Sequence, residues 1–172
     1  TFKNISSASN SKLTTQESLG KFNIKPLIQF EPATVLVVDD VFLNRQLLIK
    51  YLEDYPELSI LEAENGKIAI EMVNQYKPDI ILMDMKMPVM DGFEAIKIIK
   101  AIESLQSIPI LVITASVFKQ TKEEVISISE GFLQKPVSQK ALILKISEFL
   151  KNRIYENEAN QDYSKKESPV FA

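Results

Sequence analysis

Residues 34–41 read TVLVVDDV and residues 80–92 read IILMDMKMPVMDG, and these two stretches decide the fold. Each begins with a short run of large apolar side chains that ends in aspartate. Runs rich in Val, Ile and Leu are typical of strands buried on both faces of a parallel sheet. Similar runs recur along the chain, and the expected strands are residues 35–38, 59–63, 80–83, 110–113 and 132–133.

Segments of helix length separate these runs. The expected helices are residues 42–55, 67–76, 93–104, 121–129 and 138–152. Regular alternation of strand and helix favours parallel strands with right-handed crossovers and helices on both faces of the sheet. The predicted fold is therefore a doubly wound α/β domain. In the flavodoxin-like strand order 2-1-3-4-5, the first and third strands are neighbours.

Polar side chains follow several of the expected strands at the carboxyl edge of the sheet, where open α/β folds bind ligands. Asp39 and Asp40 follow the first strand, Asp84 the third, Thr114 the fourth and Lys135 the fifth. Three clustered carboxylates repel one another unless a cation is present, and an all-oxygen site suits Mg²⁺. A carboxylate faced by a metal and a lysine can attack phosphorus. The expected product is an aspartyl phosphate.

Each of these signals also has a purely structural interpretation. Paired aspartates after a strand are often turn residues or a helix N-cap. Residues 84–88 and 135–136 could be ordinary loops, and Thr114 could be a strand residue with a satisfied hydroxyl. The functional interpretation rests on their joint occurrence, because all of them fall at one edge of the predicted sheet in the right order.

The composition restricts the chemistry further. The 172 residues include neither cysteine nor histidine, which excludes disulfides, thiolate metal sites and every triad built on imidazole. The net charge of −3 and the lack of a long apolar run argue against nucleic-acid binding and against a membrane span. We expect a cytoplasmic domain without direct membrane contact. The chain opens with Thr1 rather than methionine, so we expect a segment of a longer polypeptide.

The composition also changes near both ends of the chain. Residues 1–20 are rich in Ser, Thr and Asn, and residues 22–30 alternate in polarity around a proline. We interpret residues 1–33 as a linker with an edge strand or extended arm, residues 34–151 as the folded domain, and residues 152–172 as a polar tail. The start of this tail is expected to be a frayed extension of the last helix, followed by disorder.

The motifs VVDD at residues 37–40, LMDMKMPVMDG at 82–92, ITA at 113–115 and KP at 135–136 resemble the receiver domain of two-component response regulators. The resemblance covers residues 34–151 and implies a five-stranded (βα)5 fold. It identifies Asp84 as the phosphoacceptor.

The resemblance also implies the cation and the residues that bind it. Asp39, Asp40 and Asp84 would bind Mg²⁺ or Mn²⁺, with Asp40 the more direct ligand of the acidic pair and the backbone carbonyl of Lys86 completing the protein part of the site.

The resemblance implies a switch as well. Thr114 would move toward the phosphoryl group, Lys135 would pair with it, small Ala115 would leave access to Asp84, and Phe132 would be the switch aromatic. The readout would be the surface formed by the expected helix 121–129, strand 132–133 and helix 138–152, which could also form a homodimer.

Two features depart from the family pattern. Val41 stands where many receivers have asparagine or a carboxylate, and residues 127–134 lack the usual Ala-Gly-Ala-Asp pattern.

The protein context is predicted from weaker signals. Asn44 and Arg45 resemble the first helix of receivers in hybrid sensor histidine kinases, and residues 20–24 resemble the end of a kinase ATP-binding domain. We expect a C-terminal receiver of a hybrid kinase whose partner is a histidine kinase or a histidine phosphotransfer domain. This chain contains no kinase motif of its own.

Two alternatives belong to other classes of protein. A stand-alone single-domain response regulator would act by protein binding alone. A haloacid-dehalogenase-like hydrolase would also use strand-end aspartates, but it needs Asp-x-Asp after its first strand, whereas Asp39 and Asp40 are adjacent. No nucleotide-binding glycine motif is present, so no organic cofactor is expected.

Overall fold

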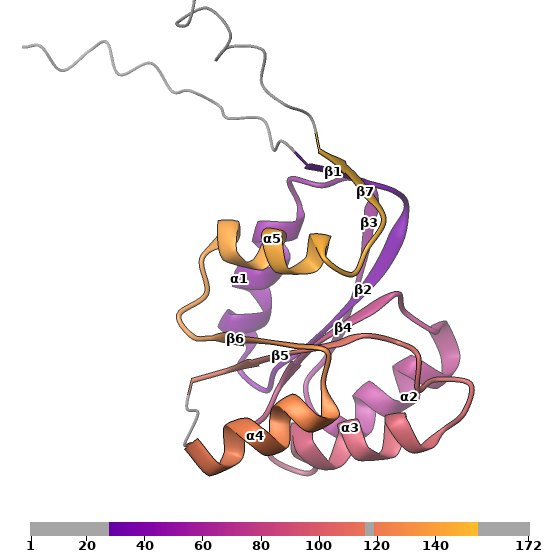
Figure 1. Cartoon of the computed structure of the whole chain (residues 1–172), viewed down its shortest axis with the longest axis vertical. Helices are drawn as coiled ribbons and strands as arrows, with labels where there is room; N and C mark the ends of the chain where they lie inside the picture. The colour runs from indigo at the N-terminus through magenta and orange to yellow at the C-terminus, as the bar shows by residue number, and fades with distance from the viewer. Residues whose placement is uncertain (1–27, 116–118, 155–172) are drawn as a thin grey trace, which may run out of the picture.

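The computed structural model describes residues 28–115 and 119–154, and its centre is a parallel sheet of five strands (Figure 1). The strands are β2 (Ala33–Val38), β3 (Leu58–Ala63), β4 (Ile80–Asp84), β5 (Ile110–Thr114) and β6 (Gly131–Gln134). Their order is β3-β2-β4-β5-β6. This arrangement confirms the predicted flavodoxin-like fold, in which β2 and β4 correspond to the first and third expected strands.

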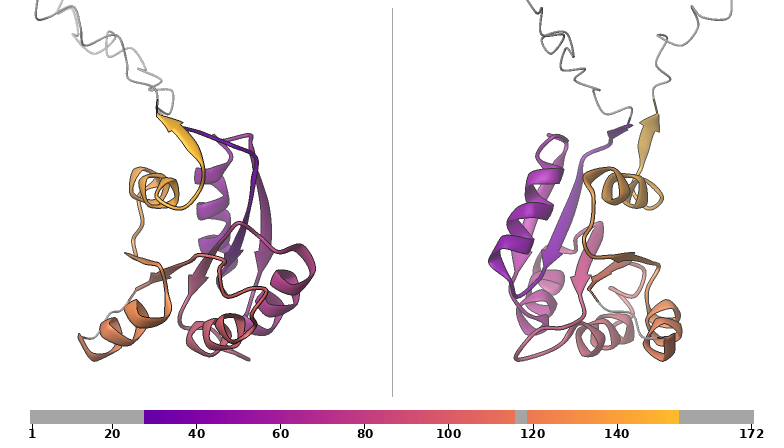
Figure 2. Two further views of the ribbon diagram at one scale, coloured as in Figure 1. Left: turned by 45° about the vertical axis from the view of Figure 1, so that its right-hand side comes forward. Right: turned by 90° about the vertical axis from the view of Figure 1, so that its left-hand side faces the viewer.

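Helices cover both faces of the sheet. They are α1 (Phe42–Leu52), α2 (Gly66–Tyr76), α3 (Gly92–Ala101), α4 (Lys119–Ile128) and α5 (Gln139–Ser147). Figure 2 shows α1 and α5 on one face and α2, α3 and α4 on the other. Alternate residues of β2 belong to two separate apolar cores, because successive side chains of a strand point to opposite faces of the sheet. Val35 and Val37 pack toward α1 and α5, whereas Leu36 and Val38 pack toward the other three helices.

Side-chain caps explain several helix starts. Asn65 accepts a hydrogen bond from the backbone N–H of Ile68, and Ser138 accepts one from Ala141. Each satisfies one donor that the first turn of a helix leaves free. The predicted starts of α2, α3 and α5 lie within one residue of those observed, and α1 begins at Phe42 as predicted although it has no side-chain cap.

The predicted helix ends are less accurate. The helix expected over 42–55 ends at Leu52, and the one expected over 93–104 ends at Ala101. The helix expected over 138–152 ends at Ser147, although the apolar pattern continues to Leu150, which is buried. Apolar residues that follow these helices belong to the core without being helical, and periodicity alone does not distinguish the two cases.

A two-stranded antiparallel ribbon lies at the amino end of the sheet. It pairs β1 (Ile28–Phe30) with β7 (Asn152–Ile154), with Phe30 opposite Asn152 (Figure 1). The interpretation of residues 152–154 as a frayed helix extension is therefore wrong. The edge strand expected within 22–30 is found over its last three residues, and the expectations for residues 1–27 and 155–172 lie outside the described residues.

The ribbon is packed onto the domain rather than suspended from it. Phe30 is 3% exposed, and its ring lies edge-on to that of Tyr55 at 5.2 Å between centroids. Ile28 joins the same apolar cluster. Within the described part of the chain, no helix is long and apolar enough to cross a membrane.

Candidate functional site

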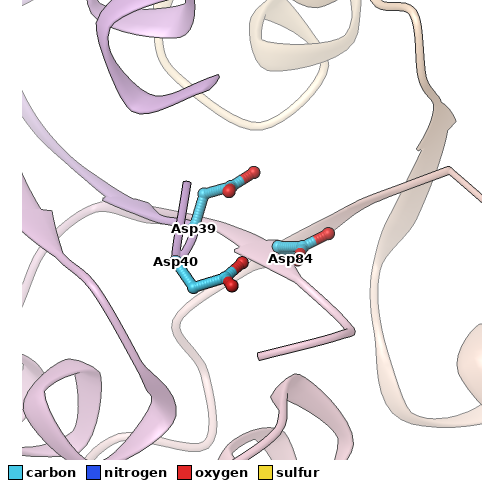
Figure 3. Close-up of side chains that lie close together, drawn as sticks. All are labelled: Asp39, Asp40 and Asp84. Atoms are coloured by element: carbon cyan, nitrogen blue, oxygen red, sulfur yellow. The ribbon is translucent and has the colours of Figure 1, made fainter. Parts of the chain in front are cut away.

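Three carboxylates meet at the carboxyl edge of the sheet (Figure 3). Asp39 and Asp40 follow β2, and Asp84 ends the neighbouring strand β4. The register pairs Val38 with Met83, so Asp39 and Asp84 are adjacent across the two strands. One oxygen from each of the three carboxylates lies within 4.8 Å of the others. Asp39 and Asp84 are buried, whereas Asp40 is exposed.

Lys135 brings a positive charge to this cluster. Its Nζ donates to Oδ2 of Asp39 at 2.6 Å and to Oδ1 of Asp84 at 3.1 Å. The backbone N–H of Lys135 donates to the carbonyl of Thr114, which fixes the start of the loop after β6 against the end of β5. The four charged residues predicted from the sequence are therefore in one place.

The carboxylate of Asp39 is held on both oxygens. Oδ1 accepts the backbone N–H of Val41 at 2.9 Å and the side-chain amide of Asn44 at 3.1 Å. Oδ2 accepts Lys135 and a longer contact from the same amide of Asn44 at 3.2 Å. A carboxylate has about four lone-pair positions. Asp39 therefore has less capacity for a direct bond to a cation than the exposed Asp40.

Burial and the neighbouring charges together shift the pKa values of Asp84 and Lys135. Burial raises the pKa of the Asp84 carboxyl, the neighbouring charges of Asp39 and Asp40 raise it further, and Lys135 opposes them. Burial lowers the pKa of the Lys135 ammonium, but its bonds to Asp39 and the charge of Asp84 outweigh this, so that pKa is raised overall. Three carboxylates and one ammonium leave an excess of negative charge that a cation would relieve.

The other predicted site residues lie at or just beyond the ends of β4 and β5, or within β6. Thr114 ends β5 and is buried, and Ala115 follows it with an exposed side chain. Lys86 lies two residues beyond Asp84, and its side chain is exposed. Phe132 lies within β6, opposite Val112, and packs half-buried against the core under α2, α3 and α4. Phe132 is thus part of the sheet rather than of the acidic cluster.

Arg45 and Asn44, at the start of α1, were not expected to contact the site. Nη1 of Arg45 donates to the backbone carbonyl of Asp39 at 2.8 Å, and its Nε pairs with Glu62 at 3.1 Å. The only signal in the sequence is that both residues lie in the first turn of the helix that follows the acidic pair.

The loop between β4 and α3 has two backbone constraints. A Cβ at Gly92 would clash with the backbone carbonyl oxygen of Asp84, so only glycine fits at this position. Val89 has φ of 70° and an 80% exposed side chain, while Met90 N–H donates to Pro88 O at 2.8 Å. This γ-turn is strained for a β-branched residue.

An apolar surface adjoins the site. Phe42, Leu43 and Leu47 of α1 are exposed large side chains. Beside them is a cavity of about 340 Å³, lined by Asn44, Leu47, Leu48, Ile113, Lys135, Pro136 and Val137. Exposed apolar groups of this kind commonly mark protein contacts.

Comparisons with known proteins identify relatives of this arrangement. The family model for the response regulator receiver domain matches residues 35–147. The chemotaxis protein CheY of Halobacterium salinarum is 36% identical over 116 residues, which cover 67% of this chain and 95% of that protein. The crystal structure of CheY4 from Vibrio cholerae has a TM-score of 0.64 at 30% identity and covers 69% of this chain and 98% of that one.

A much longer protein is also similar. Histidine kinase P4 of Formosa agariphila is 35% identical over 150 residues, which cover 83% of this chain but only 10% of the kinase. That coverage is larger than the stretch of residues 35–147, so the similarity extends into the flanking sequence.

Proposed function

Because the chain belongs to the response regulator receiver family of two-component signalling, we propose that Asp84 is its phosphoacceptor. The observation that carries this proposal is the buried Asp84 carboxylate, which faces Lys135 and two further aspartates. An Oδ atom of Asp84 attacks the phosphorus of a phosphohistidine, the N–P bond breaks, and its electron pair returns to the imidazole nitrogen. An acyl phosphate is left on Asp84.

We further propose that Mg²⁺, or Mn²⁺ in its place, binds at this site. The donors fit, because Asp39, Asp40 and Asp84 offer only oxygens, which both ions accept. Asp40 and Asp84, with the backbone carbonyl of Lys86, would hold the ion, and Asp39 would be a less direct ligand. When bound, the ion neutralises charge on the transferring phosphoryl oxygens.

The chain's own residues supply the remaining groups. The Lys135 ammonium already contacts Oδ1 of Asp84 and is placed to pair with a phosphoryl oxygen there. The Thr114 hydroxyl, at the end of the adjacent strand, donates to another phosphoryl oxygen. Ala115 adds little bulk at the mouth of the site and so leaves access to Asp84.

Phosphorylation adds about −1.5 to −2 charges at Asp84, and this is the proposed switch. Thr114 and Lys135 interact more favourably with the phosphorylated state, so the segment after β5 shifts toward the site. Phe132 then repacks, and the surface of α4, β6 and α5 changes. Homodimerisation through this surface is one proposed readout.

The phosphoryl donor must supply the histidine, because these 172 residues contain none. We propose a histidine kinase or a histidine phosphotransfer domain as the partner. The exposed Phe42, Leu43 and Leu47 offer that partner an apolar contact beside the site. We propose no nucleic-acid partner for this domain, since the net charge of the 172 residues is −3 and nucleic-acid binding usually needs a basic surface.

For the protein context, we propose the C-terminal receiver of a hybrid histidine kinase, acting in the cytoplasm. The support is the similarity to histidine kinase P4, which extends beyond the receiver itself. The alternative is a stand-alone regulator, which is supported by the near-complete coverage of CheY. The full-length gene product on either side of this segment decides between the two.

The phosphoacceptor assignment is tested with a small acyl-phosphate donor and Mg²⁺. Asp84→Asn should abolish phosphoryl uptake. Asp79→Asn is the matched control, because Asp79 immediately precedes the same strand at its amino end and accepts the backbone N–H of Thr34. Unchanged labelling of Asp84→Asn would refute the assignment. Turnover of many equivalents of a phosphoester would instead favour the hydrolase alternative.

A further inference from the structure

We propose that Asn44 is a positioning residue whose side-chain amide fixes the carboxylate of Asp39 in the orientation that the acidic site requires. This inference rests on the proposed function of the site and extends it to an uncharged residue of α1. Its basis is a contact between the first turn of α1 and the end of β2.

The contact involves both oxygens of one carboxylate. Nδ2 of Asn44 lies 3.1 Å from Oδ1 and 3.2 Å from Oδ2 of Asp39. The terminal torsion of an aspartate is broad and roughly two-fold, so the side chain's own geometry restrains the carboxylate only weakly. A donor that faces both oxygens restrains that rotation.

The other contacts of Asp39 are less able to do this. The backbone N–H of Val41 contacts only Oδ1, and Lys135 contacts only Oδ2. Lys135 is also shared with Asp84, and in the proposed mechanism its ammonium pairs with the phosphoryl group. Once Lys135 turns to the phosphoryl group, Asn44 is the remaining side-chain donor among the contacts described for Oδ2.

Arg45 holds the backbone of the same residue independently. Its Nη1 donates to the Asp39 carbonyl at 2.8 Å, and the pairing of its Nε with Glu62 anchors a side chain that is only 11% exposed. Removing the Asn44 amide should therefore release the Asp39 carboxylate while Arg45 keeps the loop in place. The expected defect is one of orientation and not of folding.

The test measures Mg²⁺ binding to the unphosphorylated protein by calorimetry. Loss of a group that orients a metal-site carboxylate commonly weakens metal binding by about 10–100-fold. We expect Asn44→Leu and Asn44→Ala to weaken Mg²⁺ binding by about tenfold or more. Asn74→Leu is the matched control and should bind Mg²⁺ as the wild type does, because the Asn74 amide donates to Ile70 O within its own helix α2 at 2.9 Å.

A double-mutant cycle separates positioning from a general effect on the fold. If Asn44 acts through Asp39, Asn44→Leu should cause no further loss of Mg²⁺ affinity in an Asp39→Asn background. Fully additive losses would overturn the inference.

Phosphoryl uptake distinguishes failure of the inference from failure of the proposed function. Wild-type protein that is labelled and binds Mg²⁺, together with a folded Asn44→Leu that binds it equally well, would overturn the inference alone. Unlabelled wild-type protein that binds no Mg²⁺ would overturn both.

Discussion

The Nζ of Lys135 lies 2.6 Å from Oδ2 of Asp39, although the two residues are 96 positions apart in the chain. This pair joins the loop after β6 to the end of β2. The Asp39 side chain is only 2% exposed, so its charge is balanced almost entirely by protein groups. The stability of the edge of the sheet therefore depends on Lys135.

We expect Lys135→Met to lower the unfolding free energy of the metal-free protein by about 2–3 kcal/mol, less than the roughly 3–5 kcal/mol typical of fully buried pairs. The reduction is smaller because the Lys135 side chain is 22% exposed. Urea unfolding measures the change. The control is Lys145→Met, which breaks a pair with the more exposed Glu148 and should cost about 1 kcal/mol or less. A variant as stable as the wild type would contradict the prediction.

The raised pKa of Asp84 predicts that this residue makes the fold less stable as the pH rises. The folded protein binds the Asp84 proton more tightly than the unfolded chain does, so the ionised carboxylate destabilises the fold at neutral pH. Asp84→Asn should therefore be more stable than the wild type at pH 7 without metal. The difference should shrink as the pH falls through the folded pKa toward the ordinary value of 3.8. Unfolding free energies measured across this range test the prediction, and a constant difference would contradict it.

The strained turn at Val89 predicts a stabilising substitution. Because Val89 has φ of 70° and is largely exposed, Val89→Gly should remove strain and lose little packing. We expect a gain of about 1 kcal/mol in unfolding free energy, at the low end for a non-glycine residue in this region. Ala101→Gly, at the exposed last residue of α3, should instead lose about 0.5 kcal/mol or less, because the full glycine penalty applies to helix interiors. Loss of stability in Val89→Gly would show that its side chain makes contacts that outweigh the strain.

The packing of the ribbon predicts that the stable unit extends beyond residues 34–151. Phe30→Ala should lower the unfolding free energy by about 3 kcal/mol, as expected for truncating a buried aromatic ring. Ile154→Ala, in the partner strand, should change it by about 0.5 kcal/mol or less because Ile154 is 69% exposed. Thermal and urea unfolding measure both variants. An effect of Phe30→Ala as small as the one expected for Ile154→Ala would contradict the prediction.

The sheet and the acidic cluster were predictable because their signals are local. The strands β2, β4 and β5 each contain a continuous apolar run. Parallel strands bring their carboxyl ends to one edge, so the positions of Asp39, Asp84 and Lys135 followed from the order of elements. Asp40 and Thr114 followed in the same way.

The ribbon and the Asn44 contact were not predictable, for different reasons. The strand Asn152–Ile154 is short and mostly exposed, and its partner lies more than a hundred residues away, so no local pattern marks it. The amide of Asn44 can cap, bond its own helix or face solvent, and only the packing of α1 against β2 selects Asp39. Its type and spacing in the sequence do not distinguish these cases.

The pairing of β1 with β7 also brings the two ends of the domain together. Ile28 and Ile154 are partners at the outer end of the ladder, so the chain enters and leaves the ribbon one strand spacing apart, about 4.8 Å. The ribbon lies at the amino end of β2, whereas the acidic cluster lies at its carboxyl end. A domain whose ends lie this close together can be inserted into a larger polypeptide while the segments on either side of it stay near each other. A segment that continues from either strand of the ribbon therefore joins the domain at the end of the sheet opposite the acidic cluster.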